Sequence, residues 1–452
     1  MKRVVASVLS LALLASCRGA DGSANAGTTT TAAIADGTFA RIQRDILDPG
    51  CAGCHSPGSS SARQSGLVLT RDSSYQQMVG VPSLQQVARA DGMSRIRPFK
   101  SDSSLLFHKL AWIPGHHARD YGLLMPSGTT QGITAGQLEY VRRWIEAGAP
   151  RVGHVADTMV LRDNRVQAAT FTPLAAPTTN GLQLKVDSFA IFPSTEREVF
   201  VYRQLGNANE LYVTRIQSKM RPGSHHLVLY TYDESATTAP CNTRPAPNAI
   251  RDLRNPDGAL NASTTAFMGC HIFFGLALSS EADFQFPPGV ALRLPANAAL
   301  DFNLHYVNRS PAEFPGEAAT NLSTVDKSQV QTVARTLNLN NALIFLPPKQ
   351  RTTLTRAFPV TVRTTVLALT SHMHSMGERF EIRVRRAGGT ESTVYTSTDW
   401  EHPAFTNYST AIVLQPGDAL VSVITWNNVT DRVITMGLKS SDEMGIIFGY
   451  AY

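Results

Sequence analysis

Two histidines stand two positions apart in the segment SHMHSMGE, residues 371–378. Side chains two positions apart on a β-strand point to the same face, so the imidazoles of His372 and His374 would lie side by side. Two imidazoles on one face can form half of a metal site. The pair therefore predicts a metal centre, provided that other parts of the chain supply the remaining ligands.

Further soft donors lie in strand-like segments of the C-terminal part. His225 and His226 adjoin in SHHLVLY, His305 lies in DFNLHYVN, and Met444 lies in KSSDEMGIIFGY. Histidine and thioether ligands without cysteine suit copper, whereas zinc more often recruits cysteine or carboxylate. Adjacent residues of a regular strand face opposite ways, so His225 and His226 reach one metal only at a bulge or a strand end.

The segment CAGCH, from Cys51 to His55, has the spacing of a c-type haem attachment site. In such a site the thiols of Cys51 and Cys54 add to the haem vinyl groups, and the histidine ligates iron. A redox C-x-x-C or half of a zinc site are the alternatives. Neither requires the following histidine, and no second C-x-x-C exists to complete a zinc site. We therefore expect one covalently bound haem c.

The second axial ligand of this haem is expected to be Met125, in the irregular loop LLMPSG. A methionine–histidine pair gives iron a potential suited to electron transfer. Met78 and Met93 are weaker alternatives, and His116 or His117 would give a bis-histidine haem.

Two predicted helices flank the haem motif. Phe39, Ile42 and Ile46 have helical spacing ahead of it, and Thr134 with Gln137 forms a capping box for a helix that ends near residue 148. This arrangement resembles a monohaem class I cytochrome c, and QLEYVRRWIEAGAP resembles the end of cytochrome modules fused to other exported enzymes. We expect a small all-α domain over residues 37–152.

The N-terminus has the pattern of an export signal. Lys2 and Arg3 precede the apolar stretch VVASVLSLALLA, and LASC then resembles a bacterial lipobox in which Cys17 is lipidated. The alternative is an ordinary signal peptide. With the lipobox, residues 1–17 are the signal, residues 18–36 form a flexible leash, and the protein is a periplasmic lipoprotein. Its contact with the membrane would be the lipid, because no later segment reaches the ~18 apolar residues of a span.

The five cysteines can all be assigned. If Cys17 takes lipid and the C-x-x-C pair takes haem, Cys241 and Cys270 remain, and an exported protein would pair them as a disulfide.

The length and composition indicate a globular chain of several domains. The chain has 452 residues and a net charge of +6 spread without Lys/Arg runs, so nucleic acid is not an expected partner. From about residue 182, short β-rich runs alternate with Pro, Gly and Asn turns, which predicts two β-sandwiches.

The order of the C-terminal motifs resembles a known family. His-His, an LHY strand, H-x-H and DEM follow one another as in the type II copper, ascorbate-dependent monooxygenases, the peptidylglycine α-hydroxylating and dopamine β-monooxygenases. The resemblance implies two jelly-roll sandwiches, over residues 182–337 and 338–452, after a linker at 153–181. It also implies two coppers: one for electron transfer, and one where O2 is activated. The implied ligands are His225, His226 and His305 for the first copper, and His372, His374 and Met444 for the second.

Two positions depart from the peptidylglycine enzymes. Thr370 stands where an arginine anchors the substrate carboxylate, and Phe448 stands where a tyrosine assists. Loss of a charge and a hydroxyl removes much of the binding energy of a carboxylate, so we expect an apolar or aromatic substrate. His271 and His402 match no family ligand and are expected to be structural or surface residues.

The predicted function is that of an exported copper monooxygenase that hydroxylates an organic substrate with O2. The fused haem would be its electron donor to the first copper, although an external donor is an alternative. The rival hypothesis is a non-catalytic copper-binding or electron-transfer protein of the cell envelope.

Overall fold

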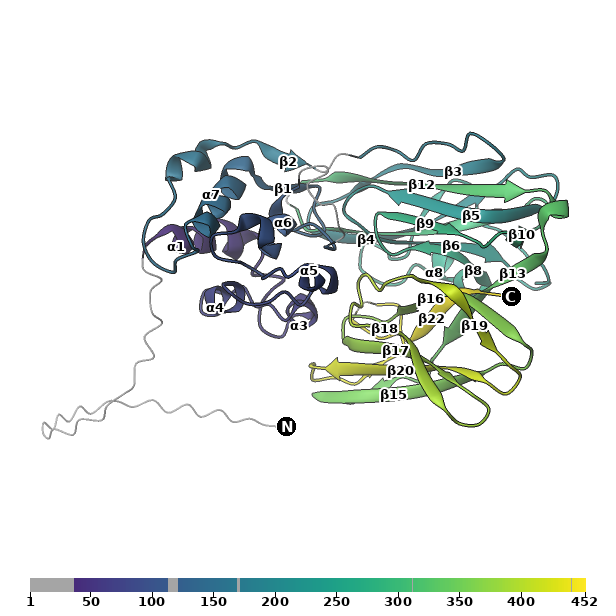
Figure 1. Ribbon diagram of the computed structural model, residues 1–452. Helices are drawn as coiled ribbons and strands as arrows, with labels where there is room; N and C mark the ends of the chain where they lie inside the picture. Colours follow the sequence, from purple (N-terminus) through teal and green to yellow (C-terminus); the bar gives the residue numbers. More distant parts are fainter. Residues whose placement is uncertain (1–35, 113–120, 169–170, 311, 440) are drawn as a thin grey trace, which may run out of the picture.

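The computed structural model describes residues 36–112, 121–168, 171–310, 312–439 and 441–452. Within these residues the chain is mostly β-sheet, and most helical segments are gathered in the N-terminal third (Figure 1). Cys17, His116 and His117, and the predicted signal and most of the leash, lie outside the described residues. None of the helices in the described part is both long and apolar enough to cross a membrane.

The helical segments are short, and α7 is the longest at 12 residues. Those of the N-terminal region are α1 (Thr38–Ile42), the π-helical η1 (Gln43–Leu47), α2 (Asp48–Gly50), α3 (Ser60–Ser65), α4 (Ser74–Met78), α5 (Gln86–Ala90), η2 (Ser101–Ser103), α6 (Leu105–Leu110), α7 (Ala135–Glu146) and η3 (Thr158–Arg162). Three more lie in the β-rich part: α8 (Ala262–Thr265), η4 (Met268–Cys270) and η5 (Lys327–Gln329).

The prediction of an all-α cytochrome c domain is wrong. Between the short helices the chain runs through loops and isolated bridges, and β1 (Gln131–Thr134) pairs with β2 (Val166–Ala168) in a two-stranded sheet. The physical reason lies in the sequence between the two predicted helices, where segments such as SPGSSS favour turns over helix. The capping box is confirmed, because Gln137 N–H donates to Thr134 Oγ1 at 3.1 Å and the Gln137 side chain accepts from Thr134 N–H at 3.0 Å.

The strands of the β-rich part form one large sheet, two smaller ones and a two-stranded pair. Their bounds are β3 (Gly181–Ile191), β4 (Thr195–Gln204), β5 (Leu211–Met220), β6 (Ser224–Tyr232), β7 (Ile250–Asp252), β8 (His271–Ala277), β9 (Glu281–Gln285), β10 (Val290–Leu294), β11 (Ala299–Asn308), β12 (Phe314–Val325), β13 (Thr332–Asn340), β14 (Phe345–Leu346), β15 (Gln350–Pro359), β16 (Thr364–His372), β17 (Gly377–Arg385), β18 (Glu391–Ser397), β19 (Thr406–Leu414), β20 (Ala419–Asn428), β21 (Ile434–Thr435) and β22 (Ile446–Ala451). A nine-stranded sheet has the order β19-β16-β22-β13-β10-β5-β12-β3, with β9 also paired to β5. The others are β7-β4-β11-β6-β8, β15-β20-β17-β18 and the pair β14-β21.

The β part also differs from two separate sandwiches, because the nine-stranded sheet runs through both halves. The expected boundary at residue 337 falls inside β13, which pairs with β10 on one edge and with β22 on the other. Alternate residues of β22 enter different cores: Phe448 and Tyr450 belong to the larger core, and Ile447 to the core beneath β15–β20. A strand buried on both faces has a continuous apolar sequence, and IIFGYA fits that description.

Candidate metal centres

His225, His226 and His305 come together at one end of the five-stranded sheet. Their ring nitrogens lie within 4.8 Å of one another, and His225 Nδ1 and His226 Nδ1 are 3.0 Å apart. His305 on β11 pairs with His226 on β6, but the next residue, Tyr306, pairs with Ser224. His225 is therefore the extra residue of a β-bulge, which lets two adjacent side chains face the same point.

The surroundings of His305 fit a metal ligand. Its Nε2 donates a hydrogen bond to Glu196 Oε1 at 2.8 Å, whereas its Nδ1 is buried and has no hydrogen-bond partner in the described part of the chain. A histidine that ligates a metal typically donates its other nitrogen to a carboxylate, which fixes the tautomer. The orphaned Nδ1 is thus the atom that would face a metal, and three imidazoles without cysteine suit copper.

Electrostatics keep the other two rings of this cluster neutral. Burial, reinforced by the charge of His305, holds the pKa of His225 and His226 well below the usual range. Burial also acts to lower the pKa of His305, but the hydrogen bond to Glu196 and nearby carboxylates outweigh it and raise that pKa. Neutral imidazole is the form that binds a metal.

His372 and His374 form a second cluster with their rings 5.1 Å apart and nearly perpendicular. His372 is the last residue of β16 and pairs with Ile446 on β22, so Met444 lies two residues before that partner. The half-buried side chain of Met444 packs against the larger core. Burial first, then His374 and His305, lowers the pKa of His372 to about 3.

His374 does not lie on a strand, contrary to the expectation from period-two spacing. β16 ends at His372, and the chain turns before β17 begins at Gly377, whose N–H donates to His374 O at 2.9 Å. His374 Nδ1 lies 3.2 Å from Asp442 O and donates to it, so Nε2 is the nitrogen that would ligate a metal. The two rings thus meet through a tight turn rather than on one face of a strand.

The loop between β18 and β19 contributes residues that the sequence reasoning missed. Glu401 Oε1 lies 3.8 Å from His225 Nε2, and the rings of His402 and Trp400 lie 5.4 Å and 6.0 Å from the His225 ring. His402 is half-buried beside the first cluster, so it lies nearer to this site than its sequence context indicated. No spacing in the sequence links it to His225, since His402 lies in a loop and His225 lies on β6.

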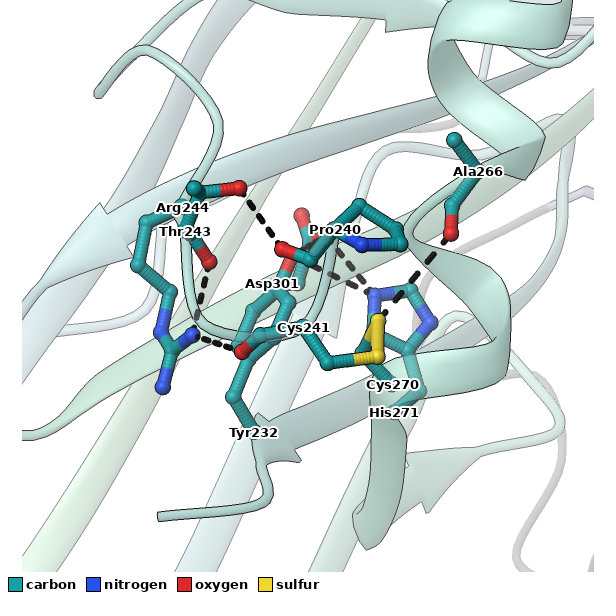
Figure 2. The surroundings of a disulfide bond; sticks show 9 residues. All are labelled: Tyr232, Pro240, Cys241, Thr243, Arg244, Ala266, Cys270, His271 and Asp301. Atoms are coloured by element: carbon teal, nitrogen blue, oxygen red, sulfur yellow. Dashed lines mark hydrogen bonds and ion pairs between the residues drawn. A yellow bond between two sulfur atoms is a disulfide. The ribbon is translucent and has the colours of Figure 1, made fainter. Parts of the chain in front are cut away.

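His271, by contrast, lies in a structural cluster beside the disulfide. Cys241 and Cys270 are joined, as predicted, and His271 Nε2 donates to the fully buried Asp301 at 2.9 Å (Figure 2). Tyr232 and Arg251 donate to the same carboxylate at 2.7 Å and 2.5 Å. This network ties β8, β6 and β11 together at Asp301, four residues before His305 on β11.

In the N-terminal region, Cys51 of CAGCH belongs to the hydrophobic core. The Cys51 and Cys54 thiols are not joined to each other, and burial raises the pKa of Cys51 to about 12. His55 Nδ1 donates to Leu67 O at 3.1 Å, which leaves Nε2 as a donor for iron. Met125, half-buried, packs against the same core as Cys51, whereas Met78 is fully buried within that core.

The N-terminal region contacts the surroundings of both histidine clusters. Near the first, Arg309 N–H donates to Gly128 O at 2.8 Å, and its guanidinium donates to Ser127 Oγ at 3.0 Å and to Glu401 at 3.3 Å. Near the second, Arg63 Nη2 donates to Ser375 O at 2.7 Å. The surroundings of both histidine clusters are thus in contact with the region that carries CAGCH.

Comparison with known proteins identifies the C-terminal part. Residues 339–452 match the family described as copper type II ascorbate-dependent monooxygenase, C-terminal domain. This match supports a copper-dependent monooxygenase in general. The matched segment contains His372, His374 and Met444, but not the first cluster.

Other comparisons add little. No curated protein matches the chain. Among solved structures, a chain from the atomic structure of Sulfolobus Turreted Icosahedral Virus is similar, with 9% sequence identity and a TM-score of 0.18, over 59% of this chain and 60% of that chain. A chain from the structure of Broad Bean Stain Virus is similar, with 8% sequence identity and a TM-score of 0.24, over 57% of this chain and 89% of that chain. Similarities this weak carry no argument about function.

Proposed function

We propose that the protein is a copper monooxygenase that converts R–H, O2, two electrons and two protons to R–OH and water. The observation that carries this proposal is the position of His372, His374 and Met444 inside the matched family domain, next to a separate cluster of three histidines. When bound at these residues, two copper ions would supply one-electron chemistry at the first cluster and the reaction with O2 at the second. Burial is the main cause that lowers the pKa of His372 and His374, and the charge of His305 adds a smaller contribution in the same direction to both.

An apolar or aromatic substrate is the form of R–H that these surroundings favour. Thr370 is fully buried, and its hydroxyl donates to Ala404 O at 2.9 Å. The Phe448 ring packs 4.7 Å from the Phe273 ring. Neither residue offers a charge to a carboxylate, which agrees with the departure noted in the sequence.

The electron donor in this proposal is a haem attached to Cys51 and Cys54, with His55 and Met125 as axial ligands. Its support is the contact of the loop that follows Met125 with Arg309, which also touches Glu401 beside His225. The donor would then serve the first cluster without a separate carrier. We also propose export and lipid attachment at Cys17, as the N-terminal pattern suggests.

Metal analysis combined with oxygen uptake tests the proposal. We expect two coppers and one iron per chain, with oxygen consumption that depends on an apolar organic substrate and yields a hydroxylated product. Stoichiometric copper with no substrate-dependent oxygen consumption in a broad screen would favour the non-catalytic copper protein instead.

A further inference from the structure

The turn between His372 and β17 is held by a buried carboxylate. Glu443 is completely buried, and its Oε2 accepts from His374 N–H at 2.9 Å while its Oε1 accepts from Met376 N–H at 2.7 Å. Oε2 also accepts from Trp426 Nε1–H at 2.8 Å and from Met444 N–H at 3.3 Å. One side chain thereby joins the backbone of His374 to that of Met444.

The same turn is held from the opposite side by the N-terminal region. The Arg63 guanidinium donates to Ser375 O, the carbonyl between the two N–H groups that Glu443 accepts. It also donates to Gly58 O, three residues after His55. Arg63 and Ser375 are 312 positions apart in the sequence, so this contact depends on the docking of the whole N-terminal region.

Glu443 and Arg63 act on one backbone unit in a complementary way. The Glu443 carboxyl accepts from two N–H groups, and the Arg63 guanidinium donates to the carbonyl between them, so the plane of the turn is fixed from both sides. Hydrogen bonds in which one partner is charged are about twice as strong as neutral ones, which applies to the guanidinium. Burial raises the pKa of Glu443 to about 7, so the Glu443 side of the clamp rests on its hydrogen bonds and not on a full charge.

We propose that Glu443 and Arg63 are the positioning residues of the second metal site, and that Arg63 makes its geometry depend on docking of the segment that carries CAGCH. Glu443 sets His374 relative to Met444, and Arg63 ties their turn to the loop after His55. The role in metal binding rests on the proposed function, whereas the clamp itself exists in the copper-free protein. Neither residue is a ligand or a catalytic residue in this proposal.

Amide hydrogen exchange of residues 373–377 in the full-length, copper-free protein tests the clamp directly. We expect Glu443→Gln to speed exchange at His374 and Met376 by about 10-fold or more, because the NH2 group of Gln cannot accept one of the two backbone hydrogen bonds. Arg63→Gln should speed exchange in the same turn several-fold, because a charged hydrogen bond is lost. Arg63→Lys keeps one charged donor and should recover part of the protection. Glu381→Gln, on β17, and Arg71→Gln, in an exposed ion pair with Asp48, are matched controls that should leave the turn unchanged.

Titration with copper alone provides the second measurement. Glu443→Gln should weaken the second copper by roughly 10- to 100-fold and reduce the sulfur signal in X-ray absorption, with the first copper unaffected. If Glu443→Gln does not fold, Arg63→Gln and Arg63→Lys still decide the matter. Unchanged exchange in the turn of both Gln variants would overturn the proposal, and so would unchanged exchange in the Arg63 variants alone where only those fold. If the wild-type protein binds no copper at His372 and His374, the proposed function fails while the exchange experiment still judges the clamp.

Discussion

At the scale of single residues, the sharpest evidence for a metal is the orphaned nitrogen of His305. A buried ring nitrogen without a partner costs free energy of about 1–3 kcal/mol unless something occupies its lone pair. Glu196 accepts from the other nitrogen and fixes which one is left. The polar groups of this site are therefore organised for a ligand that the protein atoms do not supply.

We predict that His305→Ala abolishes stoichiometric copper binding at the first cluster and leaves the second intact. Glu196→Gln should be milder, with an affinity lowered roughly 10- to 100-fold, because it keeps the ligand but weakens its orientation. Metal analysis after dialysis checks both, with the exposed His154→Ala as control. Retention of both coppers in His305→Ala would remove this residue from the ligand set.

The buried Asp301 cluster predicts acid sensitivity. Burial alone would raise the pKa of Asp301, but the hydrogen bond from His271 and the charge of Arg251 outweigh it and lower that pKa. A carboxyl whose folded pKa lies below its unfolded value of about 4 contributes stability above that pH and loses it as the pH falls through the folded pKa. Acid should therefore weaken this part of the fold below about pH 4.

Asp301→Asn tests this assignment. It should cost roughly 3–5 kcal/mol of unfolding free energy at neutral pH, since Arg251 would be left buried without its counter-charge. The free energy of unfolding of the variant, measured with urea, should also fall less steeply below about pH 4 than that of the wild type. If the free energy of unfolding falls with decreasing pH as steeply in the variant as in the wild type, other carboxylates govern acid unfolding.

At the scale of elements, strands and turns decide which ligands meet. The sequence predicted strands around each histidine motif, and it correctly required a bulge or strand end for His225 and His226 to share a metal. It did not predict that His374 lies in a turn, because the residue that holds that turn, Glu443, is 69 positions away. Period-two spacing describes only the local geometry of a strand. The hydrogen bond from His374 N–H to Glu443, which is distant in sequence, holds a turn in place of that strand.

Gly377 permits this turn. A Cβ at this position would clash with Met373 Sδ and lie 3.1 Å from His374 O, so either the buried Met373 side chain or the turn must shift. We predict that Gly377→Ala destabilises the protein by about 1–3 kcal/mol and weakens the second copper more than the first. Gly388→Ala is the matched control, because a Cβ there meets nothing within 4 Å. Equal copper affinities in the two variants would show that the turn adapts without cost to the site.

At the scale of the whole molecule, the N-terminal region contacts two parts of the chain that are distant from it in sequence. The motifs CAGCH, His-His and H-x-H could be recognised from sequence because their ligands are local. The contacts that relate them, from Arg63 to Ser375 and from Ser127 to Arg309, join positions 312 and 182 apart. Tertiary packing alone creates these neighbours, which is why Glu401 and His402 were missed at the first cluster.

The docked N-terminal region leads to a prediction about electron supply. Ser127 and Gly128 follow Met125 directly, and Arg309 connects them to Glu401, which lies 3.8 Å from His225 Nε2. A haem held by His55 and Met125 would therefore be tethered beside the first cluster in the folded chain, where a tether raises the effective concentration of donor at acceptor. Each turnover of the proposed reaction needs two electrons, so a single haem would have to be reduced again after it has passed on the first electron.

Rapid mixing of the fully reduced protein with O2 and a turnover substrate measures this supply. We expect haem absorbance to return to the oxidised form at the rate of product formation. Met125→Ala should slow both together, because it removes an axial ligand. Arg309→Gln, which keeps Met125 but loosens the contact with Ser127 and Glu401, should slow haem reoxidation several-fold without altering copper content, since loss of a charged hydrogen bond costs roughly 1–2 kcal/mol of docking. Haem that stays reduced through many turnovers, while ascorbate alone sustains the rate, would show that the haem serves an external partner.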